Sequence, residues 1–279
     1  MRGASLTLET VRFSYGAKPV LEGLDLHVPA GGMVALLGPN GSGKSTLLNL
    51  VTGVLRPRAG RVRIDSVDLA AIPPRVRARR IAMVPQMLSV PFAFTVREWV
   101  SLGRTPYLSP LGGERAEDKE AVARAMQQAQ VEDLAERLVG EISGGERQRA
   151  ALALALAQQP ALLLLDEATA HLDVHHQMAL LALVRHLNRE EGLTVLAAIH
   201  DLNLAALWFD RLLLLHDRHL VADGPSAEVL RPELLESVFR SRVSVLQHPT
   251  EGVSIVALQK PVASGEEVTR RPDETVARR

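Results

Sequence analysis

The spacing of apolar residues in the first quarter of the chain is typical of β-strands. Between residues 5 and 28, apolar and polar positions alternate, which is the pattern of strands with one buried face. Tyr15-Gly16 interrupts the alternation and predicts a turn between two strands. Residues 60–64 resume the strand pattern, and Pro73-Pro74 breaks the chain after it. We therefore expect this part of the chain to consist largely of strands.

Short apolar runs and longer helix-forming stretches alternate through the rest of the chain. A strand that is apolar throughout is typical of a parallel sheet that is covered on both faces. Such strands are expected at residues 33–37, 81–84, 161–165 and 194–199. Residues 92–160 change character and are expected to be mostly helical, and the individual helices are expected at 117–131, 143–159, 176–189 and 202–209.

A glycine-rich stretch lies between the first apolar run and a helical pattern. It matches the phosphate-binding loop, in which backbone N–H groups cradle phosphate oxygens at the start of a helix. Lys44 is expected on the β- and γ-phosphates and the Ser45 hydroxyl on Mg²⁺. We expect a nucleoside triphosphate to bind here; the alternative is a glycine-rich turn without a ligand. The loop and its first helical residues are Gly38, Pro39, Asn40, Gly41, Ser42, Gly43, Lys44, Ser45 and Thr46.

Two acidic residues follow the apolar run 161–165, where an α/β protein places ligand-binding groups. Asp166 is expected to hold Mg²⁺ through its water shell. Glu167 is expected to orient the attacking water or to accept its proton. The alternative is that both carboxylates only cap the next helix. Beside a phosphate-binding loop, we favour the catalytic role.

Polar side chains also follow two other strands that are expected in the same sheet. His200 follows 194–199 and is expected to contact the γ-phosphate, although a single histidine is more often structural. Gln86 follows 81–84 and is expected to ligate Mg²⁺ or water and to sense nucleotide occupancy, with a plain loop residue as the alternative.

Composition excludes several other classes of function. Lys plus Arg equals Asp plus Glu, 32 each, so the net charge does not favour nucleic acid as a partner. Arg75, Arg77, Arg79 and Arg80 could form a local nucleic-acid patch, but a solvated face is the preferred interpretation. The chain has no cysteine, and no apolar run approaches the length of about 20 residues that spans a bilayer. We therefore expect a cytosolic protein that reaches a membrane only through a partner.

A second motif identifies a family. The stretch 142–149, Ile-Ser-Gly-Gly-Glu-Arg-Gln-Arg, resembles the LSGGQ signature of ATP-binding-cassette (ABC) ATPases, with Ile142 for Leu and Glu146 for Gln. Residues 170–173 resemble the Ser-Ala-Leu-Asp motif of that family, with His171 as an added titratable group. The resemblance implies that Tyr15 stacks on adenine. It also implies a head-to-tail dimer of two copies around two ATP molecules, in which each copy contributes Ser143, Gly144, Gly145, Glu146 and Asp173.

The resemblance also implies an architecture. The fold class is α/β: a P-loop NTPase core with a mixed sheet, an N-terminal antiparallel β subdomain and an inserted helical subdomain at about 88–158. The ABC ATPase domain spans 1–258. Residues 259–279, rich in charge, Gly and Pro, are expected to form a disordered C-terminal tail.

Within this family, residues 91–104, 200–205 and 222–225 resemble the subgroup that powers import of ferric siderophores, haem or cobalamin. The expected partners are transmembrane permease subunits and, indirectly, a solute-binding protein, which would place the chain at the cytoplasmic face of the membrane. Phe92, Phe94 and Trp99 are candidates for contact with the permease, although core packing is an alternative. The competing interpretations are a soluble ABC ATPase acting on nucleic acid or ribosomes, and the ATPase subunit of an exporter.

Overall fold

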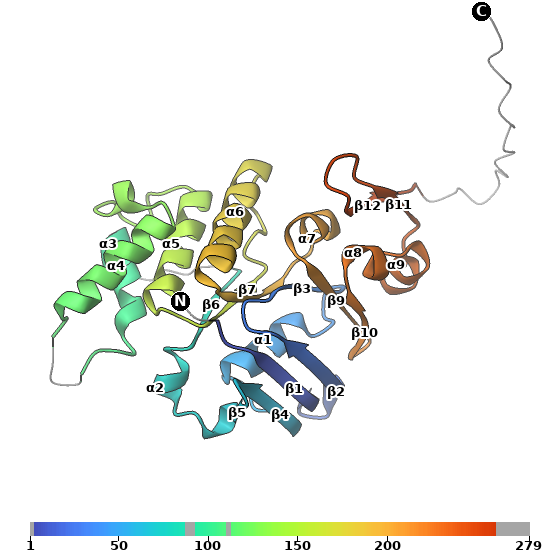
Figure 1. Ribbon diagram of the computed structural model, residues 1–279, viewed down its shortest axis with the longest axis horizontal. Coiled ribbons are helices and arrows are strands. Elements are labelled where there is room, and N and C mark those ends of the chain that lie inside the picture. The colour runs from blue at the N-terminus through green and yellow to red at the C-terminus, as the bar shows by residue number, and fades with distance from the viewer. Residues whose placement is uncertain (1–2, 87–92, 110–112, 261–279) are drawn as a thin grey trace, which may run out of the picture.

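The central feature of the fold is a six-stranded mixed sheet. The computed structural model describes residues 3–86, 93–109 and 113–260 (Figure 1). The strands follow the order β10-β9-β3-β8-β7-β6, and all neighbours are parallel except β9 and β10. They are β3 (Met33–Leu37), β6 (Ile81–Val84), β7 (Leu162–Asp166), β8 (Thr194–Ala198), β9 (Arg211–His216) and β10 (His219–Gly224).

Side chains of this sheet alternate between two hydrophobic cores. Val34 and Leu36 belong to one core, and Ala35 and Leu37 belong to the other. Because both faces are covered, the strands are apolar throughout, as the sequence predicts. The carboxyl ends of β3, β6, β7 and β8 therefore meet at one edge of the sheet, where the polar residues that follow each strand are brought close together.

An antiparallel sheet covers the first of these cores together with α1 (Lys44–Thr52). Its order is β2-β1-β4-β5, and the turn at Tyr15-Gly16 joins β1 to β2 as predicted. Leu6 and Leu8 of β1 are buried against Leu47 and Leu50 of α1 in the same cluster. The strands are β1 (Leu6–Tyr15), β2 (Lys18–Val28), β4 (Ala59–Ile64) and β5 (Val67–Asp68), followed by a short 3₁₀ turn, η1 (Leu69–Ala71), and by α2 (Pro74–Arg77).

Three helices form a separate layer at one end of the molecule (Figure 1). They are α3 (Val96–Ser101), α4 (Ala116–Gln128) and α5 (Gly144–Ala157), with 3₁₀ turns η2 (Leu102–Arg104) and η3 (Glu132–Leu134). The expected helix 117–131 ends earlier, at Gln128, and the chain continues through η3. The expected start of the helical subdomain near 88 lies outside the described residues.

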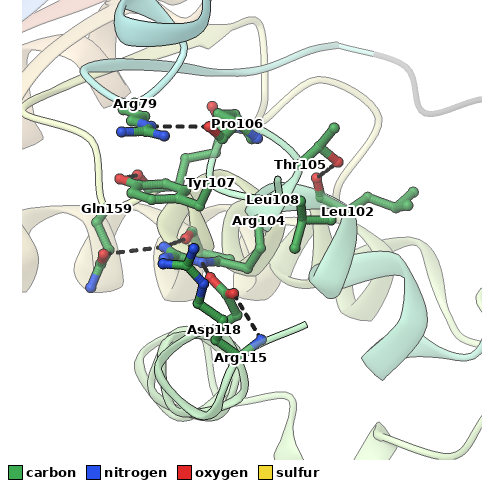
Figure 2. Close-up of polar contacts among 12 residues, drawn as sticks. Arg79, Leu102, Arg104, Thr105, Pro106, Tyr107, Leu108, Arg115, Asp118 and Gln159 are labelled. Atoms are coloured by element: carbon green, nitrogen blue, oxygen red, sulfur yellow. Dashed lines mark hydrogen bonds and ion pairs between the residues drawn. The ribbon is translucent and has the colours of Figure 1, made fainter. Parts of the chain in front are cut away.

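A buried ion pair between Arg104 and Asp118 lies at the C-terminal end of α5 and connects that end to the other elements of this layer (Figure 2). The Nε of Arg104 donates to Asp118 Oδ1 at 2.9 Å, and its Nη1 donates to the Ala157 carbonyl at 2.7 Å. Burial opposes ionisation of Asp118, but hydrogen bonds from the Arg115 amide and from Arg104 hold the pKa of its carboxyl below the usual value. These contacts attach the end of α5 to η2 and to the start of α4.

Tyr107 extends this cluster toward the sheet. Its ring lies between two guanidinium groups, with Arg104 at 3.6 Å and Arg79 at 4.6 Å from the ring centroid (Figure 2). Its hydroxyl donates to the Gln158 carbonyl at 2.8 Å. We call Arg79, Arg104, Tyr107 and Asp118 the Arg104 cluster.

Each of the four arginines between 75 and 80 has a partner within the protein, although Arg75 is exposed and the other three are only half-buried. The partners are the Pro106 carbonyl for Arg75 and Arg79, the Gly53 carbonyl for Arg77, and the Asp65 carboxylate for Arg80.

The remaining helices and strands complete the second core and the C-terminal end. They are α6 (Val174–Glu191), α7 (Leu202–Trp208), α8 (Ser226–Val229), α9 (Pro232–Phe239), β11 (Val243–Gln247) and β12 (Ser254–Leu258). The β11–β12 hairpin is held to α7 by the amide of Asn203, whose Oδ1 accepts from the Val256 N–H at 2.7 Å. Within the described ranges, no helix has the length and apolar character needed to cross a membrane. The predicted tail lies outside the described residues from 261 onward.

Candidate nucleotide-binding site

The phosphate-binding loop lines a cavity of about 740 Å³ at the end of β3. Gly38 has φ +149°, and a Cβ there would overlap the carbonyl oxygen of Leu215, so only glycine fits the start of the loop. The residues of the loop and the start of α1 that line the cavity are Pro39, Asn40, Gly41, Ser42, Gly43, Lys44, Ser45 and Thr46.

Lys44 is buried at the bottom of the loop. Its Nζ donates to the Gly38 carbonyl at 2.8 Å and lies 3.7 Å from Glu167 Oε1. Burial lowers the pKa of the Lys44 ammonium, and the charge of Glu167 opposes this shift. A buried ammonium held mainly by weak carbonyl acceptors suits a stronger anionic acceptor such as a phosphate oxygen.

Ser42 gives a second indication that the loop accommodates an anion. Its Oγ is buried and has no hydrogen-bond partner within the described residues. A buried polar atom without a partner is costly in a native structure, and it suits a ligand-binding loop. The residues present therefore fit a triphosphate.

Ser45 and Asp166 form the part of the site that could hold a divalent cation. The Ser45 Oγ donates to Asp166 Oδ1 at 3.0 Å. Burial raises the pKa of the Asp166 carboxyl, although the hydrogen bond from Ser45 and the charge of Lys44 oppose this shift. No group of three or more His, Asp or Glu side chains in the described part of the chain could hold a metal by itself. Two oxygen ligands fit Mg²⁺, which keeps several waters and shares phosphate oxygens.

Glu167 lies directly against His200. The two are joined by a 2.5 Å contact between Glu167 Oε1 and His200 Nε2, and Glu167 adopts φ +51°, an unusual backbone conformation for this residue type. Neither acidic residue caps the next helix, because Asp173 caps α6. The alternative role for the acidic pair is therefore excluded, and the contact of His200 with Glu167 joins the ends of two strands.

Tyr15 lines the cavity, whereas Gln86 is not among the residues that line it. Tyr15 lines the cavity with half of its surface exposed and contacts Phe13 edge-on, with 4.9 Å between ring centroids. Gln86 is exposed just after β6 and has no hydrogen-bond partner among the described residues.

The signature residues are separate from this cavity. Ser143 caps α5: its N–H donates to Glu146 Oε2 at 2.7 Å, and its Oγ accepts from the Glu146 N–H at 3.3 Å. The hydrogen bond that the Ser143 N–H donates to the Glu146 carboxyl is the main cause that lowers the pKa of this group. None of Ser143, Gly144, Gly145, Glu146 and Asp173 lines the cavity that contains the phosphate-binding loop.

Five charged or titratable residues of the cavity wall were missed by sequence reasoning: Lys18, His216, Asp217, Arg218 and Arg240. Lys18 follows Tyr15 closely, so its position could have indicated it. His216, Arg218 and Arg240 come from the β9–β10 turn and from the end of α9, and nothing in the local sequence marks them as parts of a phosphate site.

This arrangement defines a class of protein. It is an α/β nucleoside triphosphatase with a phosphate-binding loop and with an Asp-Glu pair at the carboxyl end of a buried strand. The sequence profile of the ABC transporter family matches residues 21–170, which is more than half of the chain. The chain belongs to the ABC transporter family, and it is an ATPase.

Relatives with assigned functions match nearly the whole chain. It is 40% identical over 256 residues to a ferric enterobactin transport ATP-binding protein of Escherichia coli (strain K12), covering 92% of this chain and 93% of the relative. It is 43% identical over 256 residues to a hemin import ATP-binding protein of Nocardia farcinica, covering 92% of this chain and 88% of the relative.

Solved structures agree with the fold. A chain of an inward-facing ABC transporter described as metal-chelate type aligns with a TM-score of 0.81 at 28% identity, covering 92% of this chain and 98% of that one. A dimeric bacterial ABC transporter cassette aligns with a TM-score of 0.70 at 28% identity, covering 79% and 98%.

Proposed function

We propose that this ATPase energises import of an iron–siderophore, haem or cobalamin-type compound through separate membrane subunits. The observation that carries the catalytic part is the convergence of Lys44, Ser45, Asp166, Glu167 and His200 at one sheet edge, beside a loop that fits a triphosphate. The substrate class is supported by relatives that act in ferric enterobactin and hemin transport and match most of the chain.

The chemistry follows from the positions of these groups. Lys44 would exchange the carbonyls of Gly38 and Pro39 for β- and γ-phosphate oxygens when ATP binds. Ser45 and Asp166 would hold Mg²⁺, which neutralises phosphate charge. Glu167 would orient the attacking water and accept its proton, and His200, which contacts Glu167, would contact the γ-phosphate.

A second copy would complete each site. Ser143 and Gly145 begin a 14-residue helix, whose N-terminus is positive, yet they lie outside the cavity of their own chain. A head-to-tail pair would bring this helix end to the nucleotide of the other copy. The dimeric cassette described above supports such a pair. Within the proposed pair, Tyr15 would stack on the adenine, and Gln86 would lie near the metal and the attacking water.

Glu167→Gln tests the site and the pairing together. The amide keeps the shape of the carboxylate but loses its basicity, so ATP turnover should fall by at least about a hundredfold while ATP binding persists. The mutant should also shift to a dimer with ATP in size-exclusion chromatography, because charge repulsion across the pair is reduced. Wild-type turnover in this mutant would exclude the assigned role of Glu167.

Ser143→Arg is the matched test of the composite site. It should abolish hydrolysis while leaving the ATP affinity of a single copy within about twofold of the wild-type value, because the signature serves the opposite copy. Hydrolysis that survives this substitution would contradict the head-to-tail pair.

Vesicle uptake tests the transported class. The chain, reconstituted with its permease subunits and a solute-binding protein, should show ATPase stimulation and uptake with one of a ferric siderophore, haem or cobalamin. Outward transport, or stimulation by none of the three, would rule out the proposed import function. In such a complex the chain would lie at the cytoplasmic face of the membrane.

A further inference from the structure

His176 packs directly against the signature turn. A Cβ added to Gly145 would overlap Cγ, Cδ2 and Nε2 of the His176 ring. Gly145 does not have a positive φ, so its backbone conformation alone does not require glycine. The absence of a side chain at Gly145 is therefore explained by the close approach of this imidazole.

The imidazole is itself held in place by the cap of α6. The Nδ1 of His176 lies 2.7 Å from Asp173 Oδ1, and the same oxygen accepts the His176 N–H at 2.9 Å. The ring of His175 meets it edge-on, with 5.4 Å between centroids. The Asp173 contact fixes the rotation of the ring and directs the opposite ring edge at Gly145.

The same turn of α6 also holds the loop that begins at Glu167. Gln177 donates from Nε2 to the carbonyl of Thr169 at 3.2 Å, and the Ala170 N–H donates to the Glu167 carbonyl at 2.9 Å. Two adjacent residues of one helical turn, His176 and Gln177, therefore contact the signature and the Glu167 loop.

We propose that His176 is a positioning residue that sets the signature turn relative to the Glu167 loop. His176 would thereby couple the position of Glu167 in the nucleotide site of this copy to the position of the signature, which this copy presents to the nucleotide site of the other copy. The inference rests on the proposed head-to-tail pair. His176 itself contacts neither the phosphate-binding loop nor Glu167 in the described structure.

Two substitutions separate positioning from simple packing. His176→Ala removes both the Asp173 contact and the atoms against Gly145. In His176→Asn, the amide nitrogen of asparagine takes the place of the histidine Nδ1 and can still contact Asp173. The asparagine Cγ and Oδ1 take the places of the histidine Cγ and Cδ2 against Gly145. Alanine should lower kcat by roughly ten- to a hundredfold, as a displaced reacting group does, and asparagine should restore most of the loss. His186→Ala, exposed on the same helix, should match wild type.

The measurements are steady-state ATPase rates, ATP affinity of a single copy by fluorescent-nucleotide titration, and the thermal unfolding midpoint. We expect single-copy affinity within about twofold of the wild-type value in both His176 variants, so that the loss falls on kcat. Wild-type kcat in His176→Ala, or no rescue by asparagine in a folded protein, would overturn the inference.

A double-mutant cycle provides an independent test of direct contact. Adding Gly145→Ala to wild type should reduce kcat further than adding it to His176→Ala, because the overlap with the ring is absent in the second background. Equal losses would show that the two residues act separately. If Ser143→Arg abolishes hydrolysis but the cycle shows no coupling, only the role of His176 fails. If Ser143→Arg stays active, the paired site fails with it.

Discussion

At the scale of a single residue, Lys44 is already buried and positioned to bind a phosphate group. The ammonium is buried and is held by two carbonyl oxygens of the loop, which are weaker partners than charged phosphate oxygens. When a nucleotide binds, its phosphate oxygens therefore replace these carbonyl oxygens around the Lys44 ammonium, which burial has already stripped of most of its water.

Lys44→Ala should accordingly weaken ATP binding by at least about tenfold, the equivalent of about 1.4 kcal/mol, because the charge buried at the bottom of the loop is lost. Equilibrium titration with a fluorescent ATP analogue measures this directly. Lys119→Ala, on the exposed face of α4, is the matched control and should bind normally. An affinity within a factor of about two of the wild-type value would count against Lys44 as the phosphate ligand.

The residues that could be predicted from the sequence share one property. Each lies in a contiguous motif or directly after an apolar strand, as Gly38, Asp166 and His200 do, and the parallel sheet brings strand ends together. Arg240 could not be predicted, because it reaches the cavity only through the packing of α9, almost 200 residues after the loop. The contact of His176 with Gly145 depends on how two helices meet, which local spacing does not encode.

At the scale of helices and strands, the elements that can be predicted from the sequence are those that bury most of their residues. α5 and the parallel strands β3, β6, β7 and β8 bury most of their residues, and the sequence predicts them. β10 and β11 were not assigned, because β10 buries no residue fully and β11 buries only Val243. α9 buries only Leu235 and Val238, so its helical pattern is short and weak.

Gly103 offers a test of how η2 is seated on α5. A Cβ at this position would overlap the Leu154 carbonyl oxygen, so Gly103→Ala should lower the free energy of unfolding by about 1–3 kcal/mol. Gly140→Ala is the control, because a Cβ there meets no atom within 4 Å. Thermal and urea unfolding would compare the two. Equal midpoints would show that η2 adjusts without cost.

At the scale of the whole molecule, the segment after Gln86 is where we expect the permease to dock. Trp99 is half-buried against the second core and lies 6.3 Å from Phe94 between ring centroids, so core packing explains part of this pair. Phe92, the third aromatic residue of the prediction, lies outside the described residues. The docking role of this segment stays a prediction.

The variants Phe94→Ala and Trp99→Ala should each be compared with a control variant, Val54→Ala. The side chain of Val54 is exposed just after the end of α1. At least one of the first two should keep its fold and basal ATPase but lose transport and stimulation by the permease subunits, because aromatic side chains often anchor interfaces. Circular dichroism, ATPase assays and vesicle uptake measure these properties. If each aromatic variant either unfolds or transports normally, the permease docks elsewhere.

The Arg104 cluster anchors α5 at the end of the helix that lies farthest from the signature. Arg104 and Tyr107 hold the carbonyls at its C-terminal end, whereas Ser143 at the other end is exposed. Fourteen residues of helix extend about 21 Å. A tilt of about 10° around the fixed end would therefore displace the signature by about 4 Å, which exceeds the length of a hydrogen bond. In the proposed pair, a small rotation of α5 about this end would be enough to make or break the contact of the signature with the nucleotide of the other copy.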